Sequence, residues 1–311
     1  MVQDIEVREG HAEVTGGRVW YRVDGNGPGM PLATVHGGPG ATHDYLEPLK
    51  VLATDRPVLF YDQLGAGKSD APDNITLWTN DRLVDELNQV LDAAGLDRVH
   101  LFGQSWGTMV AAEFALRAPE RLASLVLSDP LLSMPRFAAG TAALRATLPV
   151  RVREVLDRHE EAGTLESEEY QEAAMEFNRR FVCRLDPWPE PLMRTFGQLN
   201  GTIYERMQGP NEFLITGIHR DYDITGRLGD ISVPTLFICG RHGETRPEET
   251  TLYHSMTPGS ELVIFEESSH LPHLEEPEQY LQVLRDFLQR AEQPASARGS
   301  GSAGPAAGTF W

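Results

Sequence analysis

Short apolar runs alternate with longer amphipathic stretches over much of the chain, which is typical of a sheet whose strands are joined by crossover helices. The amphipathic stretches predict helices at Leu83–Ala94, Trp106–Arg117 and Pro277–Ala291. Near the start, Ala12–Val14 and Arg18–Val23 flank a Thr-Gly-Gly turn and predict an antiparallel hairpin. The chain is therefore expected to have an α/β fold. The apolar runs predict buried strands at Leu32–Val35, Pro57–Tyr61, Val99–Phe102, Ala123–Leu127, Pro234–Cys239 and Glu261–Phe265.

Residues 134–227 interrupt this alternation. The segment is rich in Arg, Glu and Met, and its pattern predicts helices at Val150–Glu161, Ser167–Phe181 and Pro191–Met207. We interpret it as a helical lid inserted between two parts of one core, residues 1–133 and 228–292. Gly, Ala, Ser and Pro dominate residues 293–311, which predicts a flexible tail.

The composition narrows the possible partners. The 311 residues include 46 Asp and Glu against 27 Lys and Arg, and the resulting net charge of −19 disfavours binding to nucleic acid or anionic membranes. The two cysteines, Cys183 and Cys239, are too few for a disulfide framework. The start of the chain has no basic region followed by an apolar run, so we expect a cytoplasmic enzyme. Neither a metal nor an organic cofactor is implied, because ligand spacings such as H-E-x-x-H are missing.

A serine lies in a sequence that favours nucleophilic chemistry. Gly103-Gln104-Ser105-Trp106-Gly107 joins a predicted strand to a predicted helix, which is typical of a nucleophile elbow. The glycines relieve crowding in the tight turn, and the helix N-terminus supplies free amides and a positive dipole end. We therefore predict that Ser105 is the nucleophile.

A second glycine-rich motif, His36-Gly37-Gly38-Pro39-Gly40, follows the strand Leu32–Val35. Folds with a nucleophile elbow provide the second donor of the oxyanion hole at this place. The predicted donors are the amide of Trp106 and that of Gly37 or Gly38, with Gly38 favoured. A phosphate-binding loop is not indicated, because the pattern G-x-x-x-x-G-K-[ST] is missing.

A serine nucleophile needs a base, which is expected after the last strand of such a fold. Ser268-Ser269-His270 follows the strand Glu261–Phe265, so His270 is the predicted base. His273 is the weaker candidate, because it is expected over the start of the final helix. We expect the remaining histidines, including His36, His43 and His242, to be structural or exposed.

Together these motifs resemble the proline iminopeptidase family of α/β-hydrolases, a family of serine aminopeptidases. The resemblance covers about residues 3–291 and extends to Asp62-Gln63, to Gly209-Pro210-Asn211-Glu212-Phe213, to Gly240-Arg241 and to Ser269-His270. It implies an α/β-hydrolase fold with a mostly parallel sheet and an inserted helical lid. It also implies that Glu212 and Glu244 bind the free amine of the substrate.

One position departs from the family pattern. The family has an aspartate in a Gly-x-x-Asp-Glu turn after the seventh strand, and here the turn reads Gly240-Arg241-His242-Gly243-Glu244. Asp129, after the sixth strand, could supply the missing acid from the same rim as Ser105, although it could also be a cap before Pro130. Glu244 could do so too, but this would remove it from the amine site, so we favour Asp129. An enzyme with no acid is the third possibility.

The expected reaction is hydrolysis of the amide bond after an unblocked N-terminal residue, through an acyl-enzyme on Ser105. Small peptides or amides are the expected substrates, and a preference for proline is implied by the resemblance alone. The aromatic candidates for the pocket are Trp106, Phe181, Trp188 and Tyr204. Alternatives are an amide hydrolase that removes a protecting aminoacyl group from a secondary metabolite, an esterase without amine recognition, and a decayed hydrolase that acts as a binding protein.

Overall fold

A computed structural model describes residues 5–293 of the chain. Its eight-stranded sheet has the order β1-β2-β4-β3-β5-β6-β7-β8. The hairpin of β1 and β2 pairs antiparallel with β4, and the other neighbours in the sheet pair parallel. The predicted α/β architecture is confirmed. The strands are β1 (Val7–Val14), β2 (Gly17–Asp24), β3 (Leu32–Val35), β4 (Val58–Tyr61), β5 (Val99–Gln104), β6 (Leu122–Ser128), β7 (Thr235–Gly240) and β8 (Glu261–Phe265).

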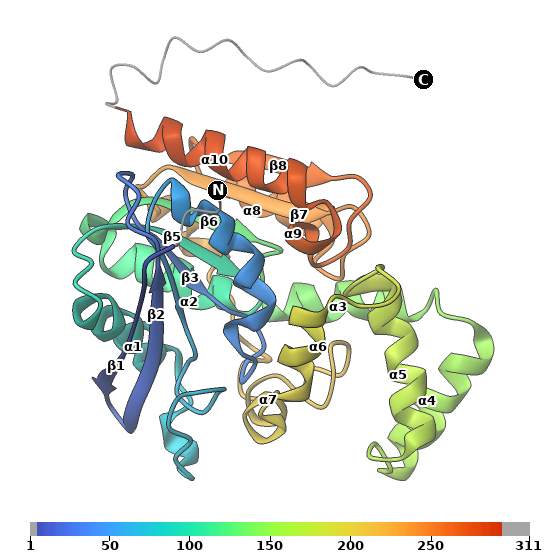
Figure 1. Ribbon diagram of the computed structural model, residues 1–311. Helices are drawn as coiled ribbons and strands as arrows, with labels where there is room; N and C mark the ends of the chain where they lie inside the picture. Colours follow the sequence, from blue (N-terminus) through green and yellow to red (C-terminus); the bar gives the residue numbers. More distant parts are fainter. Residues whose placement is uncertain (1–4, 294–311) are drawn as a thin grey trace, which may run out of the picture.

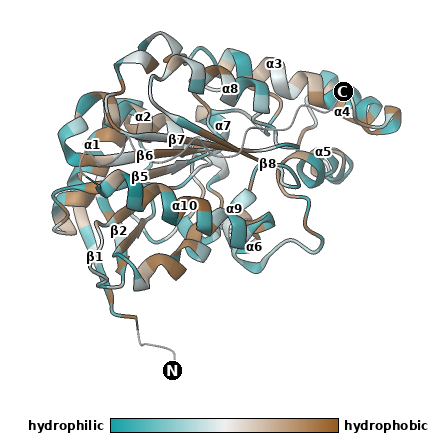
Figure 2. Ribbon diagram, turned by 90° about the horizontal axis from the view of Figure 1, so that it is seen from above, coloured by the Kyte–Doolittle hydropathy of each residue, from teal (hydrophilic) through white to brown (hydrophobic). Residues whose placement is uncertain are grey.

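The central strands are buried on both faces because helices cover both sides of the sheet (Figure 2). One apolar cluster joins the sheet to α1 (Asn80–Ala93), α2 (Gly107–Arg117) and α8 (Pro247–Met256). A second cluster joins the other face to the 3-10 helix η1 (His43–Thr54) and to α10 (Pro277–Glu292). Strand residues therefore alternate between two cores, which explains why these strands appear in the sequence as continuous apolar runs.

Most of the remaining helices follow β6 and precede β7 in the chain. In the lid segment, residues 134–227, α4 and α5 pack on each other and project away from the sheet (Figure 1). These two helices share a small apolar cluster with Phe213. The lid helices are α3 (Met134–Arg145), α4 (Val150–Ala162), α5 (Glu168–Phe181), α6 (Glu190–Gly197) and α7 (Gly201–Met207); the short elements are η2 (Ile75–Leu77), η3 (Pro119–Arg121), η4 (Thr225–Asp230) and α9 (Pro272–Glu275).

One prediction for the lid segment was wrong, and one helix of the segment was missed. The single helix expected over Pro191–Met207 is divided into α6 and α7, because Gly197 ends one helix and Asn200 caps the next. The Asn200 side chain accepts a hydrogen bond from the Ile203 amide, 3.2 Å away. Helix α3 was not predicted at all: its small residues give no strong apolar stripe.

The division into core and lid stays a prediction, and residues 294–311 of the predicted tail lie outside the described residues. No helix within residues 5–293 combines the length and the apolar character that a membrane span requires.

Candidate active site

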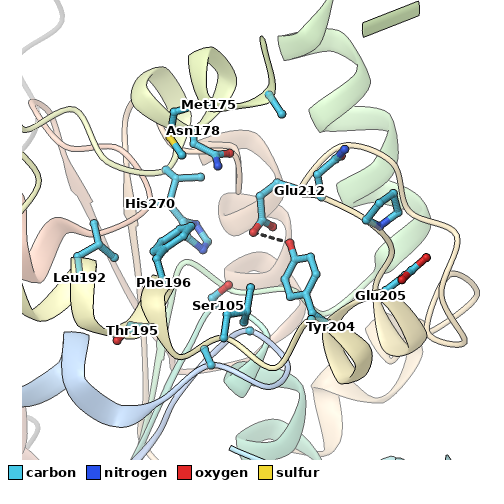
Figure 3. Close-up of a pocket in the computed structure, with 18 of the residues that line it drawn as sticks. Ser105, Met175, Asn178, Leu192, Thr195, Phe196, Tyr204, Glu205, Glu212 and His270 are labelled. Carbon is cyan, nitrogen blue, oxygen red and sulfur yellow. Dashed lines mark hydrogen bonds between the residues drawn. The ribbon is translucent and has the colours of Figure 1, made fainter. Parts of the chain in front are cut away.

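The backbone around Ser105 forms a tight turn between β5 and α2. Ser105 has a left-handed backbone with φ of +54°, and its amide donates to Ser128 O at 2.9 Å. A Cβ on Gly107 would lie 2.4 Å from the Val35 carbonyl oxygen, so only glycine fits there. The local sequence thus allows the strained turn that points Ser105 into a cavity (Figure 3).

The glycine-rich loop after β3 offers one free amide to the same cavity. The Gly37 amide donates to Tyr45 Oη at 2.7 Å and is therefore occupied. Gly38 lines the cavity with φ of +114°, and no hydrogen bond from its amide is found among the described residues. The same holds for the amide of Trp106. This geometry suits the expected pair of oxyanion donors, Gly38 and Trp106.

Tyr45 and Gln104 connect this loop to His270, and sequence reasoning missed both. The Tyr45 hydroxyl donates to Gln104 Oε1 at 2.6 Å, and Gln104 Nε2 donates to the carbonyl oxygen of His270 at 3.0 Å. Gln104 occupies a variable position of the elbow motif, so the motif gave no signal for it. His273 lies outside the cavity lining, and its Nε2 contacts the Tyr45 carbonyl oxygen at 3.1 Å.

His270 has a different carboxylate on each side of its ring. Asp129 Oδ1 lies 4.0 Å from Nδ1, and Glu244 Oε1 lies 3.4 Å from Nε2. Burial lowers the pKa of His270 to about 3, with a further contribution from His273, so the ring is neutral at physiological pH. Nε2 has no hydrogen-bond partner within the described part of the chain. A neutral ring with a free Nε2 can accept a proton.

Asp129 lies at the carboxyl end of β6 and is fully buried. Asp129 and Ser105 are the two non-glycine residues with positive φ within residues 5–293, and the φ of Asp129 is +50°. Burial raises the pKa of Asp129 well above its usual range, while hydrogen bonds from Gly240, Ser128 and Thr245 act in the opposite direction. Strained backbone at a buried acid is typical of functional sites.

Glu212 and Glu244 form a second pair of carboxyl groups in the cavity wall, where Glu244 is buried and Glu212 is half-buried. Tyr204 Oη donates to Glu212 Oε1 at 2.6 Å (Figure 3). Gln208 Nε2 donates to Glu212 Oε2 at 2.8 Å. Burial raises the pKa of Glu212 to about 7, and it raises the pKa of Glu244 well above its usual range, with further contributions from the charges of Glu212 and Asp129. The Glu244 Oε2 atom has no hydrogen-bond partner among the described residues. A cation between these carboxyls would offset the cost of their burial.

The cavity has a volume of about 520 Å³ and lies between the strand ends and the lid segment. Of the four predicted aromatic residues, only Tyr204 lines it; the prediction was wrong for Trp106, Phe181 and Trp188. Trp106 instead points into the core, where its Nε1 donates to His219 Nδ1 at 3.2 Å. Phe196 of α6, which was not predicted, is an aromatic side chain of the lining.

Comparisons with known proteins agree with this arrangement. The sequence profile of the alpha/beta hydrolase fold matches residues 31–277. A proline iminopeptidase of Heyndrickxia coagulans is 46% identical over 282 residues, which cover 90% of this chain and 98% of the relative. Another of Saccharolobus solfataricus is 38% identical over 288 residues, covering 91% and 93% of the two chains.

Solved structures give the same result. The crystal structure of VinJ superposes with a TM-score of 0.88 at 40% identity, covering 91% of this chain and 98% of the other. The crystal structure of a proline iminopeptidase of Mycobacterium smegmatis has a TM-score of 0.84 at 37% identity, with the same coverage of 91% and 98%.

Proposed function

Because the chain belongs to the proline iminopeptidase family of the α/β-hydrolase fold, we propose that it hydrolyses the amide bond after an unblocked N-terminal residue. The observation that carries this proposal is the pair of carboxyl groups, Glu212 and Glu244, that lines the same cavity as Ser105 and His270. Two carboxyl groups with raised pKa values are suited to bind one ammonium group, which would form charge-assisted hydrogen bonds with them. With the N-terminal amine bound there, the carbonyl group of the same residue would be accessible to the Ser105 hydroxyl.

The proposed reaction follows from the groups around the cavity. His270 Nε2 takes the proton of the Ser105 hydroxyl as Oγ attacks the carbonyl carbon, and the amides of Gly38 and Trp106 hold the resulting oxyanion. Collapse of the tetrahedral intermediate breaks the C–N bond, and the His270 proton goes to the leaving amine. Water, deprotonated by His270, then attacks the acyl-enzyme and releases the free amino acid with the regenerated serine.

We assign the acid to Asp129 rather than to Glu244. The two carboxyls lie on opposite sides of the ring, and Nε2 must be free to exchange a proton with Ser105. Glu244 is near that nitrogen, at 3.4 Å, and Asp129 is on the Nδ1 side. Asp129 can therefore support the imidazolium ion from behind while Glu244 remains available to the substrate amine.

A second candidate function is supported by the size of the cavity. A volume of about 520 Å³ is within the range of about 300–1,000 Å³ that is usual for drug-sized ligands. Apolar side chains of the lid segment line it, among them Met175, Leu192 and Phe196. This lining supports an amide hydrolase that removes an aminoacyl group from a bulky, apolar amine.

The test is to compare kcat/KM for prolyl and alanyl arylamides with that for their N-acetylated forms. We expect turnover of the free amines and its loss on acetylation, because acetylation removes the charge that Glu212 and Glu244 would bind. Equal rates on both forms would contradict amine recognition and indicate an esterase or general amidase.

If no arylamide is turned over, aminoacyl amides of large apolar amines should be tested next, together with labelling by a fluorophosphonate. Labelling that Ser105→Ala abolishes would support a live nucleophile and the second candidate function. A wild-type protein that is not labelled would indicate a decayed hydrolase and contradict both proposals.

A further inference from the structure

The carboxylate that we assign to the catalytic base does not touch it. Asp129 Oδ1 and His270 Nδ1 are 4.0 Å apart, which is too far for a hydrogen bond. The position where the family resemblance places an acid is occupied by Gly243, which has no side chain. A carboxylate at this distance can attract a positive imidazolium, but it cannot by itself fix which ring nitrogen carries the proton.

The side chain of Thr245 lies in this gap. Its hydroxyl donates to Asp129 Oδ1 at 3.3 Å and lies 3.4 Å from His270 Nδ1. Thr245, Asp129 and His270 are all buried, and Thr245 is 2% exposed. The hydroxyl is therefore in position to contact both partners at once.

The chemistry of a hydroxyl sets the direction of this contact. Burial disfavours the ionised form of Asp129, and the hydrogen bonds that its carboxyl accepts favour it. In this ionised form, which the proposed role requires, the carboxylate only accepts hydrogen bonds, so the single Thr245 proton points to Asp129. The lone pairs of the same oxygen can then accept a proton donated by His270 Nδ1. With its proton on Nδ1, the neutral ring presents an unprotonated Nε2, which is the form that a general base requires.

We propose that Thr245 is a positioning residue that links His270 to Asp129, so that the acid acts on the base through the threonine hydroxyl. The link fixes the tautomer of the resting ring and, when His270 gains a proton, connects the imidazolium to the buried carboxylate through two hydrogen bonds. Such a chain is polarised along its length, which strengthens each bond in it. The inference rests on the proposed roles of Ser105, His270 and Asp129.

The test uses two substitutions that differ in the hydroxyl. Thr245→Val keeps the shape but removes the donor and acceptor, and Thr245→Ser keeps both. We expect Thr245→Val to lower kcat about 10- to 100-fold, the usual effect of losing a hydrogen bond to a charged group, with KM unchanged. Thr245→Ser should retain kcat within about threefold, a rescue that a purely structural role of the threonine would not predict.

Thr141→Val is the matched control. Thr141 is also fully buried, and its hydroxyl donates within α3, to the carbonyl oxygen of Phe137 at 3.1 Å. This variant removes the same group outside the cavity lining, and kcat should remain that of the wild type. A comparable loss in both valine variants would show a general cost of removing a buried hydroxyl and would overturn the proposal.

A double-variant cycle tests the order of the link. If Asp129 acts through Thr245, then Thr245→Val should have little further effect in an Asp129→Asn background. If the fold losses in kcat of the two single variants multiply in the double variant, Asp129 acts on His270 directly. If Thr245→Val alone keeps the wild-type kcat, Asp129 does not act through Thr245.

Both measurements should be repeated with p-nitrophenyl acetate, which has no amine. This ester needs Ser105 and His270 but neither Glu212 nor Glu244. If Thr245→Val lowers kcat on neither the arylamide nor the ester, the link is refuted. If amine recognition alone is wrong, Thr245→Val should still lower kcat on the ester.

Discussion

Replacing Glu212 by glutamine should stabilise the protein at neutral pH although it removes a proposed substrate contact. The Glu212 side chain is half-buried, and desolvation of its carboxyl raises its pKa from 4.5 to about 7. In the proposed function, a substrate ammonium offsets this cost when it binds. Glutamine has nearly the same shape and carries no charge at any pH.

The sign and size of the effect follow from proton binding. Between pH 4.5 and about 7, the folded protein keeps a proton on Glu212 that the unfolded chain has lost. The stability that this proton contributes is fully present below pH 4.5 and is lost as the pH rises through 7. The whole loss amounts to about 3 kcal/mol, which corresponds to about 5 °C in Tm for a chain of this length.

The surroundings of Glu212 can accommodate the amide. Tyr204 Oη would still donate to the amide oxygen, as it does to Glu212 Oε1 at 2.6 Å. The new NH₂ group would face Gln208 Nε2, which donates to Oε2 in the wild type. Rotation of the Gln208 amide solves this conflict, because its Oε1 has no hydrogen-bond partner among the described residues and would then accept from the glutamine.

The assay is urea unfolding of wild type and Glu212→Gln at pH 5 and pH 8. The control is Glu205→Gln on the preceding helix α7, where the side chain is exposed and the change should cost less than about 0.5 kcal/mol. We expect the Glu212 variant to gain under about 1 kcal/mol at pH 5 and about 3 kcal/mol at pH 8. An equal gain in the free energy of unfolding at both pH values, or no gain at pH 8, would refute the inference that ionisation of Glu212 destabilises the folded protein.

Three further predictions concern the turn after β7 and its neighbours. Asp129→Asn should lower kcat by up to about 10⁴-fold with KM little changed, as measured on a prolyl arylamide; a loss confined to KM would contradict its role as the acid. Glu244→Gln should raise KM for free-amine substrates and leave the rate on p-nitrophenyl acetate, which has no amine, unchanged, so a fall in kcat on both substrates would argue against amine binding. In the Asp129→Asn background, Gly243→Asp should restore kcat at least tenfold, whereas Gly243→Ala, which adds the same Cβ without a carboxylate, should not.

The sequence predicts the centre of the sheet better than its edge. Leu32–Val35 and Glu261–Phe265 are strands with the bounds that the apolar runs predict. At the edge, β1 runs over Val7–Val14, whereas the sequence predicted only Ala12–Val14. Ala12 is the one fully buried residue of that strand, so its length is determined by pairing with β2 and not by a hydrophobic pattern.

The local turns of the site are also predictable, because each depends on a few neighbouring residues. Ser105 needs a left-handed backbone between two glycines, and the sequence contains that requirement within five residues. Tyr45, Gln104 and Thr245 are different. They take their places through side-chain contacts between segments far apart in the chain, such as the 2.6 Å bond from Tyr45 to Gln104, and no local pattern encodes such contacts.

The turn after β7 shows why proximity in sequence is a poor guide to the role of an acid. Glu244 is adjacent to Gly243 and so is the obvious substitute by position, yet its carboxyl faces the nitrogen that must exchange a proton with Ser105. Asp129 is more than one hundred residues away in the chain, but β6 and β7 are neighbours in a parallel sheet, and their carboxyl ends share one edge. A Cβ at position 243 would lie only 3.1 Å from the Ser269 backbone, so the present turn packs closely against the histidine loop without an acid of its own. The roles that we propose for the two carboxyls around one imidazole therefore follow from sheet topology, which places Asp129 on the Nδ1 side of the ring and Glu244 on the Nε2 side.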